Sequence, residues 1–122
     1  MRVLLPEKDR DAFRFLFWRD DPGSIIDVLR MMVHLFGAKP SSSVATFALQ
    51  QCARDNAADF SPEAIAAILN DFYCDDFLKS LELEKTCIRL IDELTDICSR
   101  GGFHLTKWVS NSKKVLEVIP KE

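Results

Sequence analysis

The chain has 122 residues, 48% of them apolar, and a formal net charge of −3. This size suits one compact domain with a single modest core, and the acidic balance excludes a protein that binds nucleic acid through overall positive charge. No apolar run approaches the roughly 20 residues of a membrane span, and charged residues follow the N-terminus too soon for a secretory signal. We therefore expect an intracellular protein, cytoplasmic or nuclear, with no membrane partner.

The first half of the chain predicts a helical turn, strands and then a helix. Residues 6–12 have the composition of a short helical turn, and the alternating aromatic residues of 13–18 predict a strand. Turn-forming residues occupy 19–23. The apolar residues of 24–37 fit either a helix face or a strand, and we predict mainly strand. Helical spacing of apolar residues then predicts a helix from about 41 to 55.

The second half predicts two clear helices. Ser61 is a suitable N-cap for a helix that fades into an extended segment near Asn70. Apolar residues from 83 to 98 form one stripe opposite a charged face, which predicts an amphipathic helix closed by Gly101 and Gly102. Two shorter elements follow, a strand at 103–108 and a final helix or turn at 111–119.

The cysteines form no recognisable metal or disulfide pattern. Cys52, Cys74, Cys87 and Cys98 include no Cys-x-x-Cys pair, and the chain has only two histidines. This spacing argues against a zinc module, and a disulfide framework has no support without a secretory signal. We expect the four side chains to act as small buried hydrophobic groups.

Two adjacent aspartates, Asp75 and Asp76, interrupt the apolar, aromatic segment NDFYCDDFLKS (70–80). The flanking apolar runs predict a β-hairpin that reverses at Cys74, Asp75 and Asp76. Two carboxylates this close repel unless a cation compensates them, and Mg²⁺ binds carboxylate oxygens together with water and phosphates. The alternative is a solvated turn with two acidic residues, as expected for the other adjacent pair, Asp20 and Asp21.

The sequence FYCDDFL resembles the Tyr-x-Asp-Asp catalytic hairpin of reverse transcriptases. Four ordered blocks are similar to the polymerase palm of Pao/BEL-type long-terminal-repeat retrotransposon polyproteins and together cover essentially the whole chain. The blocks are PEKDRDAFRFLFW, HLFGAKPSSSVATFAL, FYCDDFLKS and ELTDICSRGGFHLTKWVSNS. The resemblance implies an α+β fold, a partial polymerase palm in which an antiparallel sheet with the hairpin packs on two or three helices. It also implies a single partial reverse transcriptase domain over residues 1–122.

The resemblance assigns roles to the hairpin. Asp75 and Asp76 would be catalytic and would bind Mg²⁺, two ions in the intact enzyme, with Asp76 closer to the primer end. Tyr73 would underlie the site, and Cys74 would face the primer strand. The implied reaction is nucleotidyl transfer by an RNA-directed DNA polymerase.

Three further positions are implied to bind the nucleotide or the primer–template. Gly37 would border the incoming nucleotide and template, where a missing side chain allows close approach of the backbone. Lys39 would contact a phosphate, or would be simply solvated. Lys107 matches a basic position of the family, with a structural role as the alternative. The family often has proline where Ser42 stands, so this loop departs from the family pattern.

The resemblance also implies parts that lie outside the matched blocks. The family places a third catalytic carboxylate upstream of the first block, and residues 1–8 do not supply it. Most of the fingers, the thumb and a ribonuclease H domain are likewise expected elsewhere. We therefore expect a truncated or decayed element, or one piece of a longer polyprotein, with little activity of its own. Its partners would be an RNA or DNA primer–template, a deoxynucleotide and the remaining polyprotein domains. The alternative is an inactive, decayed or co-opted α+β binding or scaffold protein.

Overall fold

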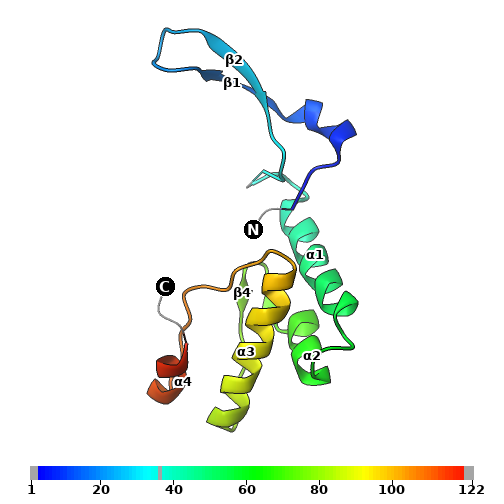
Figure 1. Ribbon diagram of the computed structural model, residues 1–122, viewed down its shortest axis with the longest axis vertical. Helices are drawn as coiled ribbons and strands as arrows, with labels where there is room; N and C mark the ends of the chain where they lie inside the picture. The colour runs from blue at the N-terminus through cyan, green and yellow to red at the C-terminus, as the bar shows by residue number, and fades with distance from the viewer. Residues whose placement is uncertain (1–2, 36, 120–122) are drawn as a thin grey trace. The chain divides into compact units, whose positions relative to one another are not determined.

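The computed structural model describes residues 3–35 and 37–119 and divides the chain into two compact units, residues 2–41 and 42–122 (Figure 1). Helices and two small antiparallel sheets alternate along the chain, which confirms the α+β class. The single domain over 1–122 stays a prediction.

The first unit contains a 3-10 helix and a two-stranded ribbon. The helix η1 (Glu7–Phe13) follows Pro6 and leads directly into β1 (Arg14–Trp18), which pairs antiparallel with β2 (Ile26–Arg30). The turn that joins the strands is closed by the amide of Ser24, which donates to the carbonyl of Asp21 at 3.0 Å. These elements confirm the predicted helical turn, first strand and turn.

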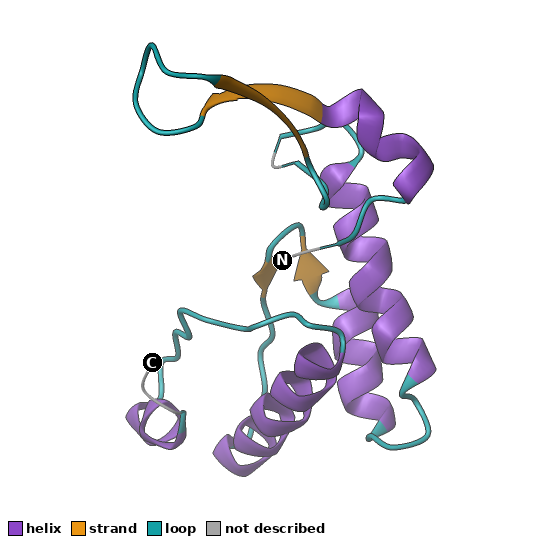
Figure 2. Ribbon diagram, turned by 45° about the horizontal axis from the view of Figure 1, so that its top comes forward, coloured by secondary structure: helices purple, strands orange, loops and turns teal. Residues whose placement is uncertain are grey.

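The second unit contains the helices and a short hairpin, which Figure 2 distinguishes by colour. In chain order the elements are α1 (Ser41–Asp55), α2 (Pro62–Asn70), β3 (Phe72–Tyr73), β4 (Asp76–Phe77), α3 (Glu84–Arg100) and α4 (Lys113–Val118). The three long helical patterns of the sequence are thus confirmed, because periodic burial of one face is a strong local signal.

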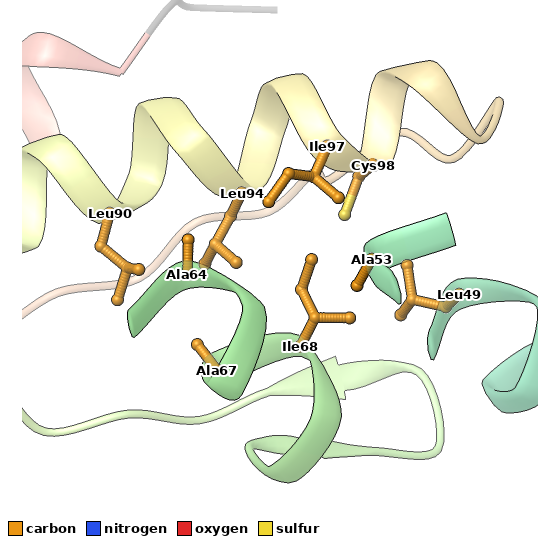
Figure 3. Packing of buried hydrophobic residues seen from close by; sticks show 9 residues of the cluster. All are labelled: Leu49, Ala53, Ala64, Ala67, Ile68, Leu90, Leu94, Ile97 and Cys98. Carbon is orange, nitrogen blue, oxygen red and sulfur yellow. The ribbon is translucent and has the colours of Figure 1, made fainter. Parts of the chain in front are cut away.

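The core of the second unit lies where α1, α2 and α3 meet (Figure 3). Ile68, Leu94 and Ile97 are fully buried there, and small alanines let the helices approach closely. The remaining members are Leu49, Ala53, Ala64, Ala67, Leu90 and Cys98. Dense packing of this kind supplies most of the stability of a small domain.

A polar clamp fixes the start of α2 against α3. The Ser61 hydroxyl accepts the amide of Ala64 at 3.2 Å, the predicted N-cap, and donates to Glu93 Oε2 at 2.7 Å. The second carboxylate oxygen of Glu93 accepts the Ser61 amide at 3.1 Å. A carboxylate at a helix N-terminus satisfies free amides and complements the helix dipole.

Two strand predictions need correction. Of the predicted strand at 24–37, residue 36 lies outside the described residues, and among the others the strand is confirmed only for Ile26–Arg30, with one isolated bridge between Leu4 and Val33. The predicted strand at 103–108 is wrong, since these residues form no strand in the structure. Extended residues become a strand only beside a pairing partner, and Lys107 has a φ of 57°, outside the β region.

The predicted glycine cap at the end of α3 is confirmed at Gly102, whose φ is 72°. Gly101 has an ordinary φ of −84° and serves a different purpose. A Cβ there would lie 2.8 Å from Cys52 Sγ and 2.9 Å from the Phe103 ring. Glycine is therefore required for close packing at one position and for backbone conformation at the next.

The four cysteines are free thiols in unlike surroundings. Cys98 is buried in the core, as predicted, and burial raises the pKa of its thiol to about 12. Cys52 is half-buried, and burial raises the pKa of its thiol as well. Cys74 is exposed, so the prediction of a buried hydrophobic group is wrong for that residue. Among the described helices, none has the length and apolar character needed to cross a membrane.

Truncating the core should destabilise the second unit strongly. Leu94→Ala removes a fully buried side chain and is expected to lower the free energy of unfolding by about 2–5 kcal/mol in urea titrations followed by circular dichroism. Leu78→Ala, at a residue that is 73% exposed, is the control and should change it by less than about 0.5 kcal/mol. Equal losses for the two variants would contradict this account of the core.

Thiol reactivity should follow burial. At pH 8 in native conditions, iodoacetamide is expected to modify Cys74 at least about 100-fold faster than Cys98, because only an accessible thiolate reacts. Peptide mass spectrometry over time measures both rates. In denaturant the two rates should converge. Rapid native labelling of Cys98 would show that the core around α3 is open.

Candidate functional site: the β3–β4 hairpin

The β3–β4 hairpin has a two-residue turn made by Cys74 and Asp75. Phe72 pairs with Phe77 and Tyr73 pairs with Asp76, so Asp76 is the first residue of β4 and lies outside the turn. Cys74 has a φ of 53°. Two-residue hairpin turns commonly need such a left-handed residue to match the twist of the strands. The hairpin predicted from the sequence is therefore confirmed.

The two faces of the hairpin differ. Side chains of directly paired residues project from the same face. Phe72 and Phe77, with ring centroids 5.1 Å apart, pack against the helical core. Tyr73 and Asp76 occupy the opposite face, and Tyr73 is 77% exposed. The core thus holds the hairpin by its aromatic pair and leaves its acidic tip in solvent.

The base of the hairpin is closed by contacts that the sequence reasoning missed. The Leu78 amide donates to the Asp71 carbonyl at 3.0 Å, and the Lys79 ammonium forms an ion pair with the Asp71 carboxylate. The signal was present in the sequence. Once the turn is placed at residues 74 and 75, antiparallel register brings Asp71 beside Leu78 and Lys79.

Asp75 and Asp76 present two exposed carboxylates at the hairpin tip. Neither has an ion-pair partner within 4.0 Å among residues 3–35 and 37–119, where no group of three metal-ligating side chains occurs. Two carboxylates fit the ligand preference of Mg²⁺, which commonly binds one or two and fills its other positions with water and phosphate. These residues could hold such an ion only together with ligands from other molecules or segments.

An open groove of about 1210 Å³ runs beside the hairpin tip. Asp75, Asp76 and Lys107 all line it, so the structure brings the predicted basic residue to the same groove as the predicted carboxylates. Its apolar lining includes the partly exposed side chains of Ile91, Leu105 and Trp108. The groove therefore combines charged residues with an apolar wall, as binding clefts commonly do.

The segment that borders this groove is held at both ends without strand pairing. The Phe103 amide donates to the Cys98 carbonyl at 2.9 Å. At the other end the Ser112 hydroxyl donates to Glu84 at 2.7 Å, and this hydrogen bond, with nearby Lys114, lowers the pKa of the Glu84 carboxyl. Lys107 lies between these anchors with its side chain exposed.

Gly37 and Lys39 belong to the other unit. Gly37 has a φ of 84°, and a Cβ built there would have no heavy atom within 4 Å. Glycine is therefore favoured at this position by its backbone conformation. No neighbouring group among the described residues lies close enough to exclude a side chain there. Lys39 is exposed in the turn before α1. Their assigned contacts with nucleotide and template stay predictions.

Comparisons with known proteins give no relative for this chain: no family model, no curated protein and no solved structure matches it. The resemblance to reverse transcriptases accordingly depends on the residues quoted above.

The positive φ of Cys74 generates a stability prediction. An L-residue in the left-handed region costs about 1–2 kcal/mol, and glycine avoids this strain at some cost in chain entropy. Cys74→Gly should therefore raise the free energy of unfolding by about 0.5 kcal/mol. Asp75→Gly, at a residue without a positive φ, should lower it. Urea titration measures both, and the opposite order would contradict the assigned turn.

Proposed function

We propose that the β3–β4 hairpin is the metal-binding hairpin of a reverse-transcriptase-type palm, like that of Pao/BEL retrotransposon polymerases. The observation that carries the proposal is the placement of Tyr-Cys-Asp-Asp. Its turn residues are Cys74 and Asp75, its acids are exposed, and the aromatic pair behind them is packed on helices. The Tyr-x-Asp-Asp pattern in a turn so supported is far more specific than an acidic dipeptide.

The proposal gives each hairpin side chain a role. Asp75 would be the principal metal ligand, and Asp76, on the outer face with Tyr73, would lie toward the primer end. Two bound magnesium ions would stabilise the entering and leaving oxygens of an in-line displacement at phosphorus. The chain's own contribution is to hold two carboxylates at one rigid tip before substrate binds, since the aromatic pair and the Asp71–Lys79 ion pair restrain it.

The groove supplies the rest of the proposed site. Lys107 would contact a nucleic-acid phosphate, and exposed Cys74 would meet the primer strand. Separately from the groove, the resemblance gives Gly37 and Lys39, in the other unit, contacts with nucleotide and template. Palm chemistry also uses a third carboxylate, which the proposal assigns to a strand beyond the described residues. A polymerase of this kind would act on a primed RNA or DNA template with deoxynucleotides.

Metal binding tests the hairpin in the chain as it stands. Titration calorimetry should detect weak, roughly millimolar Mg²⁺ binding that the Asp75→Ala/Asp76→Ala variant loses, because few protein ligands contribute. The second adjacent pair gives a matched control: Asp20→Ala/Asp21→Ala, in the β1–β2 turn, should leave this binding unchanged. Identical titrations for the wild type and both variants would remove the metal site.

Catalysis is tested on the chain extended in frame at both ends along its gene. Such a polypeptide should incorporate nucleotides on a primed RNA template with Mg²⁺. Asp75→Asn, which keeps the shape and removes the charge, should lower incorporation by at least about 100-fold. The control variant, Asp21→Asn, should leave nucleotide incorporation unchanged. Equal incorporation by the wild type and Asp75→Asn would refute the catalytic role of the hairpin.

A small α+β binding or scaffold protein is the second candidate function. The observation that favours it is the exposure of many large apolar side chains on the β1–β2 ribbon, as binding surfaces often show. Magnesium binding equal in wild type and the Asp75→Ala/Asp76→Ala variant, together with partner binding through the ribbon, would support this candidate over the polymerase.

A further inference from the structure

One face of the β1–β2 ribbon carries a continuous apolar patch. Antiparallel pairing sets Leu16 opposite Val28 and Trp18 opposite Ile26, so these four side chains project from one face. We call this surface the ribbon face. It also includes the next pair toward the base of the ribbon, Arg14 opposite Arg30.

The apolar residues of the ribbon face are substantially exposed. Leu16 is 68% exposed and Val28 63%, while Ile26 is 47% and Trp18 39%. A two-stranded ribbon alone is marginally stable in water and normally gains stability by covering one face. A patch of four adjacent large apolar side chains is a typical docking surface.

Charge is distributed unevenly along the ribbon face. At the base, Arg14 and Arg30 share a single acidic partner, Asp11, at 3.0 and 3.3 Å, which leaves a positive excess. Both arginines also lower the pKa of the Asp11 carboxyl. At the other end, the turn carries Asp20 and Asp21, both exposed and without an ion-pair partner in the described part of the chain. The ribbon face therefore has a positive base and an apolar middle, and an acidic turn adjoins its other end.

We propose that the ribbon face docks against the ribbon face of a second copy of this chain, antiparallel about a two-fold axis. Such a symmetric pairing buries the same patch on both copies. The antiparallel orientation places the Arg14 and Arg30 end of each ribbon over the Asp20 and Asp21 end of the other. Two such sheets pack face to face about 10 Å apart, with their strands within about 30° of each other.

The charge pattern selects a second copy over other occupants. The acidic turn would repel nucleic acid or an anionic membrane. A second copy of the chain instead supplies a positive end, with Arg14 and Arg30, that complements this acidic turn. The reverse side of the ribbon lacks such a pattern. Its charges, Arg19 and Asp27, pair with each other at 2.7 Å. Apolar Phe15, Phe17 and Leu29 on that side thus have no unpaired charge beside them to set an orientation.

Sedimentation velocity of the full chain tests the patch. The wild type should form a dimer whose fraction rises with concentration. Val28→Thr, which preserves strand propensity and adds a hydroxyl, should weaken dimerisation at least about tenfold, since each dimer contains the change twice. The same substitution at Val109, 92% exposed in the other unit, should have no effect. Circular dichroism of both variants should match the wild type.

A charge exchange tests whether the charges at the two ends of the ribbon contribute to docking. Asp20→Lys/Asp21→Lys makes both ends of the ribbon face positive, and Arg14→Glu/Arg30→Glu makes both ends negative. Each variant alone should be monomeric, whereas an equimolar mixture should form a heterodimer, because every contact is then between opposite charges. The heterodimer should weaken as salt rises.

Three results would overturn the proposal: a wild type that stays monomeric at all concentrations, equal dimerisation of the Val28→Thr and Val109→Thr variants, or a mixture of the charge variants that forms no heterodimer. The assay involves none of the hairpin carboxylates, so it stands or falls independently of the polymerase proposal.

Discussion

The packing of α2 against α3 is the constraint on which the second unit depends. Ile68 from α2 and Leu94 and Ile97 from α3 are fully buried in one cluster, and the Ser61–Glu93 clamp fixes the start of α2 on the same partner helix. β3 begins two residues after α2 ends, so Phe72 continues the buried surface that the helix began. The position of the acidic tip is therefore a consequence of helix packing, because the hairpin has only its aromatic pair to bury.

At its tip, the β3–β4 hairpin departs from the conformations that its residues would favour locally. Its strands are two residues long, its turn puts a cysteine in the left-handed region, and two like charges end adjacent in solvent. Sequences that specify one structure usually avoid such conflicts except where a site requires them. The conflict is confined to the tip, while the packed rings and the Asp71–Lys79 ion pair stabilise what lies behind it. The strained residue and the exposed charges thus lie at the tip, and the packed rings lie at the base.

Helices with a long, regular apolar pattern could be predicted from the sequence. Strands that exist only when another strand pairs with them could not. The helix of Glu84–Arg100 follows from its apolar stripe, since the same residues that form the stripe bury it. The apolar and β-favouring residues at 103–108 were equally suggestive of a strand. They instead form an anchored segment that contributes Phe103 and Leu105 to the core. Strand formation requires a neighbour, and no local pattern reveals whether one is available.

For the candidate site, the sequence alone determined the turn region, the two carboxylates and the flanking aromatic residues, because a two-residue hairpin is set by neighbours in the chain. Only the tertiary structure decided which other residues line the groove at the hairpin tip. It placed Lys107 along the same groove as Asp75 and Asp76, although Lys107 lies 31 positions after Asp76 in the chain. It also exposed Tyr73 and Cys74. Burial and long-range proximity depend on how helices pack, which is a property of many residues acting together and is not encoded in any short segment.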